Sequence, residues 1–190
     1  MEAAPCIADL AAIRYLPIPT ELGTVWVAGT AAEICDISLP GTRKSEFVAR
    51  LPRGASPGET PTLASARRQL EEYFAGRRRT FDLPLRAHGT EFEKRVLRAL
   101  AQIPYGTVAT YGELAARAGS PGAARAIGRV MARNRIPIVL PCHRVVAASG
   151  LGGFAGAACL LDVKRALLER EGAAIPPTPH KRPPRRAPHS

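Results

Sequence analysis

Apolar and polar residues alternate with a period of two along two short segments near the start of the chain, which is typical of half-buried strands. Residues 22–28 and 34–39 show this alternation, and residues 29–32 between them supply a turn, so we expect a β-hairpin. Residues 52–62 are rich in Pro, Gly, Ser and Thr and favour a loop. An amphipathic helix is predicted over residues 63–74, and a further strand over residues 80–85. These elements predict a small α/β domain.

Helix signals are clearer in the second half of the chain. Thr90 and Thr110 are each followed three residues later by Glu, which is a capping box, so each predicts a helix start. The second of these helices is expected to end at Gly119. The Ser-Pro pair at 120–121 predicts the start of a third helix, and residues 162–171 predict a last one. Two short helices with a tight turn between them are typical of a helix-turn-helix, although a generic helical bundle would give much of the same pattern.

Charge points to a polyanionic partner. The net charge is +11, from 27 basic and 16 acidic residues, and four of these positive charges lie in the tail after Gly172. The body therefore keeps an excess of seven. Residues 114–161 contain no acid but six arginines, which favours contact with the phosphates of DNA or RNA, although a solvated basic surface has the same composition. The third helix is rich in Gly and Ala, which suits a narrow groove or, equally, close packing in a core.

Other features of the sequence predict the cellular location of the protein. No run of 18 apolar residues is present, and the N-terminus lacks the basic and apolar segments of a secretory signal, so no membrane association is expected. The four cysteines are far apart, which favours free thiols in a reducing, cytoplasmic compartment. Residues 174–190 contain six prolines and four basic residues and are expected to be disordered.

Residues 136–146 carry the candidate chemistry. Prolines bound an apolar run there, so we expect an extended and stiff backbone, and Cys142, His143 and Arg144 follow directly. A lone cysteine is usually a small buried hydrophobe. Here, however, the basic setting and the adjacent imidazole are expected to lower the pKa of the thiol and make it a nucleophile.

The segment Pro-Cys-His-Arg-Val at 141–145 resembles the signature of the alkylguanine-DNA alkyltransferases, also called methylated-DNA–protein-cysteine methyltransferases. The resemblance extends through residues 92–171 and, more loosely, over residues 17–85. Its further motifs are Tyr-Gly-Thr-Val at 105–108, Tyr-Gly-Glu-Leu-Ala at 111–115, Ala-Ala-Arg-Ala-Ile-Gly at 123–128 and Val-Lys-Arg-Ala-Leu-Leu at 163–168.

The resemblance implies a fold of two domains. Residues 1–87 would form a small α/β, ribonuclease-H-like domain. Residues 88–173 would form an α-helical DNA-binding and alkyl-acceptor domain with a winged-helix-like helix-turn-helix. Residues 174–190 would be the disordered basic tail.

The resemblance also implies the function. A monomer would repair 6-O-alkylguanine, mainly methylated, in double-stranded DNA by one irreversible transfer to Cys142, without a cofactor or metal. His143 would take the thiol proton, with Glu171 orienting the imidazole, and Asn134 would fix the turn before the active-site segment. Tyr111 would rotate a phosphate and donate a proton to the departing guanine.

The same resemblance implies a DNA face and a substrate pocket. Arg125 would fill the gap left by a flipped nucleotide, with the third helix in the minor groove. The further DNA contacts would be Ala124, Ala126, Arg129 and Arg144. The pocket would be lined by Pro137, Val145, Phe154 and Ala155.

Two departures from the family pattern concern the lid and a zinc site. The lid over the alkylguanine usually reads Gly-Tyr-Ser/Ala-Gly-Gly, whereas residues 153–157 are Gly-Phe-Ala-Gly-Ala, and 158–160 resemble an insertion. Some members bind zinc in the N-terminal domain. Cys6, Cys35 and His88 fall near the matching positions, but Thr30 occupies the fourth, so no metal is expected.

Two other functions fit parts of the sequence. A non-catalytic protein that flips alkylguanine and marks it for another pathway would lack the acceptor thiol, which is present here. A thiol hydrolase would need an oxyanion site and would explain neither the helix-turn-helix nor Arg125.

Overall fold

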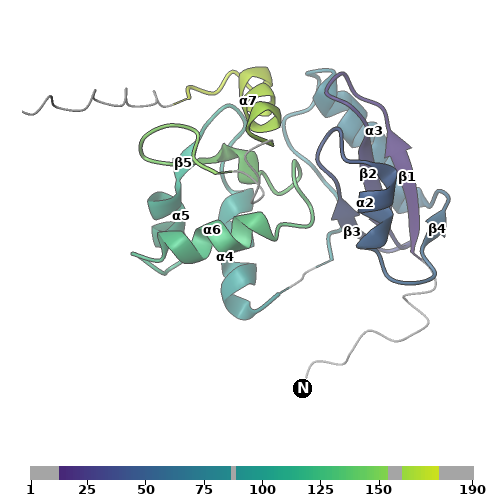
Figure 1. Cartoon of the computed structure of the whole chain (residues 1–190), viewed down its shortest axis with the longest axis horizontal. Coiled ribbons are helices and arrows are strands. Elements are labelled where there is room, and N and C mark those ends of the chain that lie inside the picture. Colours follow the sequence, from purple (N-terminus) through teal and green to yellow (C-terminus); the bar gives the residue numbers. More distant parts are fainter. Residues whose placement is uncertain (1–12, 87–88, 154–159, 176–190) are drawn as a thin grey trace, which may run out of the picture.

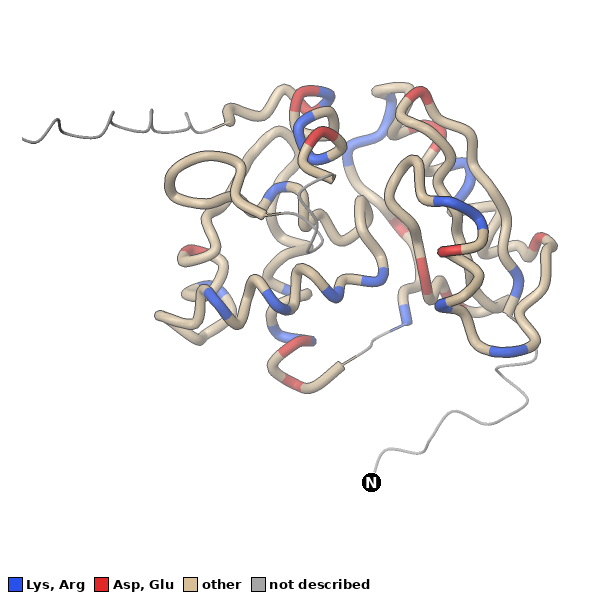
Figure 2. The backbone as a smooth tube through the Cα atoms, viewed as in Figure 1, with Lys and Arg blue, Asp and Glu red and all other residues tan. Residues whose placement is uncertain are grey.

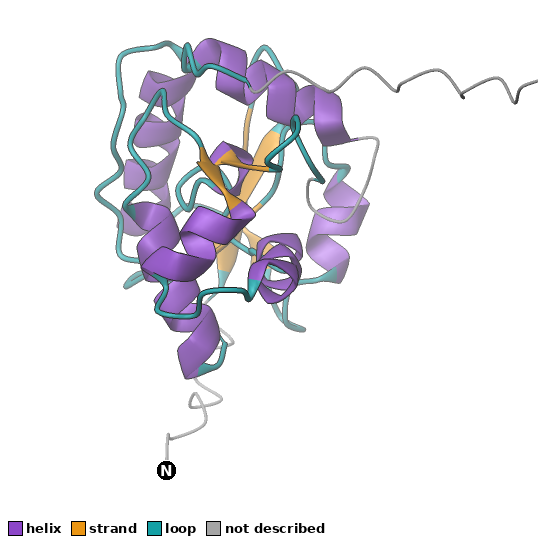
Figure 3. Ribbon diagram, turned by 90° about the vertical axis from the view of Figure 1, so that its left-hand side faces the viewer, coloured by secondary structure: helices purple, strands orange, loops and turns teal. Residues whose placement is uncertain are grey.

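The computed structural model describes residues 13–86, 89–153 and 160–175. A domain built on a β-sheet lies on one side of the molecule and a helical domain on the other, in the right and left halves of Figure 1. Helices lie outside the strands when the molecule is viewed from the side (Figure 3). Phe154 and Ala155 of the predicted pocket lie outside the described residues, as do Cys6 and His88.

The N-terminal domain contains a four-stranded sheet of order β3-β2-β1-β4. Its predicted hairpin is confirmed: β2 (Val25–Gly29) pairs antiparallel with β3 (Ile34–Ile37), although β2 begins three residues later than expected. The structure adds three elements that the pattern did not predict. They are β1 (Arg14–Ile18), α2 (Lys44–Ala49) and the short β4 (Ser56–Pro57).

Helix α3 (Pro61–Phe74) covers this sheet and matches the predicted amphipathic helix. Thr60 caps it, because its hydroxyl accepts from the Leu63 amide at 3.2 Å. The strand predicted over residues 80–85 is wrong. Only Leu85 bridges to Ile34, and the next position back is Pro84, which has no amide to extend a ladder.

The C-terminal domain is built on α4 (Glu91–Ala101), α5 (Tyr111–Arg117) and α6 (Ala124–Ala132). Both predicted capping boxes are present at the starts of α4 and α5. The third helix begins at Ala124 rather than after Ser120, because Gly122 has φ of 82°, in the left-handed region that an α-helix cannot pass through. The short strands β5 (Ala109–Thr110) and β6 (Val145–Val146) pair in parallel, and α7 (Leu161–Arg170) closes the domain.

The active-site segment is a turn, not the extended run that its prolines predicted. The Leu140 amide donates to the Ile136 carbonyl at 2.9 Å, and Ile138 between them has φ of 75°. A β-branched residue rarely adopts this conformation, so the surrounding contacts must hold it there.

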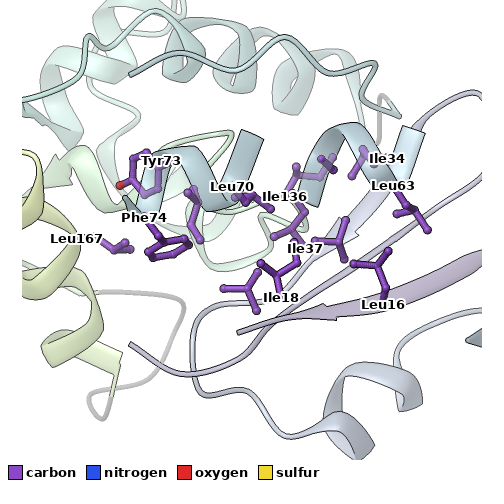
Figure 4. Close-up of a cluster of buried hydrophobic side chains, with 14 residues drawn as sticks. Leu16, Ile18, Ile34, Ile37, Leu63, Leu70, Tyr73, Phe74, Ile136 and Leu167 are labelled. Atoms are coloured by element: carbon purple, nitrogen blue, oxygen red, sulfur yellow. The ribbon is translucent and has the colours of Figure 1, made fainter. Parts of the chain in front are cut away.

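Those contacts come partly from the other domain. One hydrophobic cluster joins the sheet and α3 to Ile136, Ile138 and Leu167 of the C-terminal domain (Figure 4). The buried Asp36 of β3 bonds Arg135 at 2.6 Å and 2.8 Å, and the Ile37 amide donates to the Arg135 carbonyl at 2.7 Å. The N-terminal domain therefore holds the chain on the approach to Cys142.

None of the helices in the described part of the chain has the length and the apolar character that a membrane span requires.

Candidate active site

Cys142 opens a short 3₁₀ helix, η1 (Cys142–Arg144), at the end of the active-site turn. Its side chain is buried, and its amide donates to the Leu140 carbonyl at 2.8 Å. Burial raises the pKa of the Cys142 thiol, while a hydrogen bond from Asn134 and the positive charge of Lys164 oppose this in part. The expected lowering of the thiol pKa is therefore wrong, because loss of water outweighs the nearby positive charge. Cys142 rests as a thiol and needs a base.

His143 follows Cys142 directly in the chain. Its ring is fully buried, and its Nε2 lies 2.8 Å from Glu171 Oε1. Burial lowers the pKa of His143 more than Glu171 raises it, so the imidazole is neutral near pH 7. With Nε2–H donated to a carboxylate, Nδ1 is the basic ring nitrogen, and it is buried without a hydrogen-bond partner among the described residues.

Glu171 accepts hydrogen bonds from both sides of the site. Arg144 donates from Nε at 2.8 Å and from Nη2 at 3.0 Å, and the Gly106 amide donates at 3.2 Å. The hydroxyl of Tyr73, from α3, donates to Oε1 at 2.8 Å. Burial raises the pKa of Glu171, but hydrogen bonds from His143 and Arg144 outweigh it and bring the pKa down to about 2. The carboxylate is therefore ionised and holds the imidazole.

Lys164 is a site residue to which sequence reasoning gave no role. Its Nζ donates to the carbonyls of Val145 and Leu151 at 2.6 Å and of Gly153 at 3.1 Å. Burial lowers its pKa to about 8. The signal was in the helix pattern, because position 164 precedes the buried Leu167 and Leu168 by three and four residues and so shares their face.

Asn134 bridges the active-site turn. Its Nδ2 donates to the Leu140 carbonyl at 2.9 Å and its Oδ1 accepts from the Ile136 amide at 3.1 Å. One side chain thus spans the backbone on both sides of the strained Ile138. This links the end of α6 to the segment that carries Cys142.

A cavity of about 390 Å³ opens beside Cys142. Met131, Asn134 and Pro137 line it from the C-terminal domain, and Leu39 to Thr42 line it from the N-terminal domain. Of the predicted pocket residues, Pro137 lies here, whereas Val145 is buried in β6. The cavity offers room for a group brought to the sulfur.

Helix α6 presents a basic, acid-free face. Arg125 and Arg129 are exposed on it, and Ala124 and Ala126 are partly exposed. Figure 2 shows blue segments along this helix and the turn that follows, with no red among them. Arg144, predicted to contact DNA, is instead buried, because Glu171 and the Ile103 carbonyl take up its guanidinium.

Tyr111 is the first residue of α5 and lies on the acceptor side of the domain. Its hydroxyl donates to the Gly153 carbonyl at 3.0 Å. Burial raises its pKa, and a negative charge on Cys142 would raise it further, so the phenol is protonated.

No group of three or more potential metal ligands occurs among His, Cys, Asp and Glu of the described residues. Cys35, one of the three potential zinc ligands, donates from its Sγ to the Ala28 carbonyl at 3.4 Å. Thr30 lies at the turn of the hairpin, where its hydroxyl accepts from the Ala32 and Glu33 amides.

Residues 91–173 match the family described as 6-O-methylguanine DNA methyltransferase, DNA binding domain, and residues 13–87 match its ribonuclease-like domain. The chain belongs to the 6-O-methylguanine DNA methyltransferase family. The methylated-DNA–protein-cysteine methyltransferase of Mycobacterium tuberculosis is 39% identical over 165 residues, which cover 86% of this chain and 95% of that protein. The constitutive enzyme of Bacillus subtilis is 50% identical over 113 residues, 56% of this chain and 68% of that protein.

Solved structures of the family have the same fold. The crystal structure of Mycobacterium tuberculosis OGT in complex with DNA has a TM-score of 0.72 and 38% identity, and it covers 84% of this chain and 92% of that one. A small N-terminal domain that contains a sheet and a helical C-terminal domain are therefore the shared architecture.

Proposed function

We propose that this protein repairs DNA by transferring the alkyl group, mainly methyl, of 6-O-alkylguanine to Cys142 in a single turnover. The observation that carries the proposal is the buried array of Cys142, His143 and Glu171 beside a cavity. The relatives are named for transfer from methylated DNA to a protein cysteine, and one is seen with DNA.

The chemical step needs only the chain, its substrate and water. His143 Nδ1 takes the thiol proton through a bridging water, and the sulfur attacks the alkyl carbon in line with the bond to the guanine oxygen. The S–C bond forms as the C–O bond breaks, and the electron pair leaves on the oxygen. Tyr111 supplies the proton that makes guanine a good leaving group. A thioether has no easy leaving reaction, so one molecule performs one transfer.

DNA binding follows from the helical domain. Helices α5 and α6 act as the helix-turn-helix of a winged-helix-like domain, and α6 lies in the minor groove of double-stranded DNA. Its small residues Ala124 and Ala126 permit close approach, Arg129 contacts phosphate, and Arg125 fills the space of the flipped nucleotide. The protein acts as a monomer on DNA of the cytoplasmic nucleoid.

Domain limits and the remaining site residues complete the proposal. Residues 1–87 and 88–173 are the two domains, which the family matches over 13–87 and 91–173 support. Asn134 fixes the turn before Cys142, and Pro137, with Val145 behind the sulfur, shapes the pocket.

Intact mass tests the proposal directly. The protein is incubated with duplex DNA that carries one 6-O-methylguanine, and we expect a gain of one methyl group per chain on the peptide containing Cys142. Cys142→Ser should gain none, whereas Cys35→Ser, a change at another buried cysteine, should react fully. Unmodified wild-type protein beside unrepaired DNA would overturn the proposal.

A further inference from the structure

The N-terminal domain places one hydroxyl in the acceptor site. Tyr73 lies near the end of α3 and is fully buried, and its hydroxyl donates to Glu171 Oε1 at 2.8 Å. His143 Nε2 lies at the same distance from the same oxygen. Two residues from different domains therefore meet on one carboxylate oxygen, 98 positions apart in the case of Tyr73 and Glu171.

The ring of Tyr73 is held from several sides. Its centroid lies 5.2 Å from that of Phe74, 5.5 Å from that of Phe81 and 6.2 Å from that of Tyr105. Figure 4 shows Tyr73 at the end of the shared hydrophobic cluster, with its oxygen on the side away from Leu70. A ring fixed in this way aims its hydroxyl in one direction, so the bond to Glu171 is set by the packing of the N-terminal domain.

The hydroxyl acts only as a donor toward this carboxylate. Burial and the negative charge of Glu171 both raise the pKa of Tyr73, so the phenol keeps its proton throughout the working range. Since Glu171 is ionised, the proton of this bond belongs to Tyr73.

We infer that Tyr73 is a positioning residue of the alkyl-transfer reaction, which acts through Glu171 on His143. Its hydroxyl holds Oε1 at the place where His143 Nε2 donates, and this keeps Nδ1 free to accept the thiol proton. The inference rests on the proposed function. It makes the N-terminal domain a contributor to the chemistry rather than a scaffold alone.

Removing the Tyr73 hydroxyl should change the protonation of His143 as well as the position of its ring. Oε1 has three donors, from Tyr73, His143 and Arg144, and without Tyr73 more of its negative charge faces His143. The imidazolium form is then favoured, so the acid limb of the transfer rate should move to higher pH. The other charged or titratable groups around the pair remain unchanged: Arg144 and Cys142 of η1, Lys164 of α7 and Tyr105 of the loop after α4.

Single-turnover rates at saturating methylated duplex, measured from pH 5 to pH 9, test the inference in Tyr73→Phe. We expect a roughly tenfold lower rate at neutral pH, an acid limb at higher pH and an unchanged Kd for DNA. Tyr15→Phe is the matched control, because Tyr15 is a buried tyrosine of the same domain in a separate hydrophobic cluster. Its rate and pH profile should equal those of the wild type.

A site-specific 3-fluorotyrosine at position 73 gives an independent test with almost no change in volume, and it serves also if Tyr73→Phe does not fold. Fluorine makes the phenol a stronger donor, so the acid limb should move to lower pH. An active wild type with an unmoved acid limb in the Tyr73 variants, whatever their Tm, would overturn the inference. An inactive wild type would instead overturn the proposed function.

Discussion

At the scale of single residues, the Glu171 carboxylate connects more of the site than any other group described here. It accepts from an imidazole, a guanidinium, a phenol and a backbone amide. A buried carboxylate is tolerated only when it is satisfied in this way. The hydrogen bonds that hold Glu171 against His143 require an ionised carboxylate. The stability of the fold therefore depends on the ionisation of Glu171.

The pH dependence of stability should reveal this condition. The pKa of Glu171 is about 2 in the folded state and 4.5 ordinarily, so the ionised form is favoured by folding. A lowered carboxyl pKa contributes stability that is present above pH 4.5 and is lost as the pH falls toward 2. In urea unfolding, the gap between wild type and Glu171→Gln should therefore narrow by roughly 2 kcal/mol between pH 7 and pH 3. A gap that stays constant over this range would contradict the assignment.

Lys164 should matter for both stability and reactivity. Lys164→Met keeps most of the buried stem but removes the donor to three carbonyls and a positive charge near Cys142. We expect a loss of about 3 kcal/mol in unfolding free energy. We also expect slower alkylation of the Cys142 peptide by iodoacetamide at pH 7, where Lys164 is still mostly charged, because the thiol pKa rises further. Lys44→Met, at an exposed lysine of α2, is the control. Equal iodoacetamide rates in the two variants would refute the role of the charge.

Residue chemistry was readable from the sequence only where it depends on residue type. The Cys-His-Arg run and Glu171 could be named from their motif, and the structure brings Glu171 to His143 and Arg144. The direction of the Cys142 pKa could not be read, because it depends on burial. The burial of Arg144 could not be predicted either, because the residue type does not distinguish an exposed arginine from one that is buried against Glu171.

At the scale of elements, α4 and α5 both begin with a capping box but lie at different positions relative to the proposed site. Thr90 and Thr110 each accept from the amide of a Glu three residues on, at 3.3 Å and 3.2 Å, and each Glu carboxylate accepts from the threonine amide in turn. Only the second box precedes a proposed catalytic residue, Tyr111. A comparison of the two capping boxes therefore distinguishes an effect on the stability of a helix from an effect on the position of its first residue.

Thr110→Ala and Thr90→Ala should each lower the unfolding free energy by about 1 kcal/mol, because each removes one helix cap. Only Thr110→Ala should also slow methyl transfer, since fraying at the start of α5 displaces the Tyr111 hydroxyl from the Gly153 carbonyl that holds it. Thermal unfolding and single-turnover rates measure the two effects. Equal rates in the two variants would show that the position of Tyr111 does not limit transfer.

Elements with a local cause were predicted well and others were not. The capping boxes and the hairpin alternation act within a few residues, so α4, α5 and β2–β3 were found. The start of α6 was placed too early, because Ser120 and Pro121 imitate a cap while Gly122 adopts a conformation that local patterns do not reveal. The active-site turn was missed for a related reason: Ile138 is held at positive φ by contacts from both domains.

At the scale of the whole molecule, the two domains are joined by a shared hydrophobic core and by the ion pairs of Asp36. Ile136, Ile138 and Leu167 belong to the core of the sheet and α3, although they lie in the second half of the chain. Asp36 bonds Arg50 at 2.8 Å and Arg135 at 2.6 Å. The family resemblance predicted two domains, but no spacing in the sequence predicted these contacts. The acceptor turn is therefore a feature of the interface rather than of one domain.

The shared core predicts that the two domains unfold together. Trp26 of β2 is the only tryptophan of the chain and reports on the N-terminal domain, while a short pulse of iodoacetamide on Cys142 reports on the other. The two urea transitions should coincide. Asp36→Asn should lower both midpoints by the same amount, about 2 kcal/mol in free energy, because Arg50 and Arg135 lose a shared ionised partner but can still reach water.

A surface pair within the N-terminal domain supplies the comparison. Glu59 bonds Arg67 at 2.6 Å with both side chains substantially exposed, so Glu59→Gln should cost at most about 0.5 kcal/mol. In Asp36→Asn the Trp26 and Cys142 transitions must move together, since Asp36 acts on the Arg135 backbone that leads into the acceptor turn. If the Trp26 transition moved alone while Cys142 stayed protected, the domains would be independent. The acceptor turn would then have to be held by the C-terminal domain itself, through Asn134 alone.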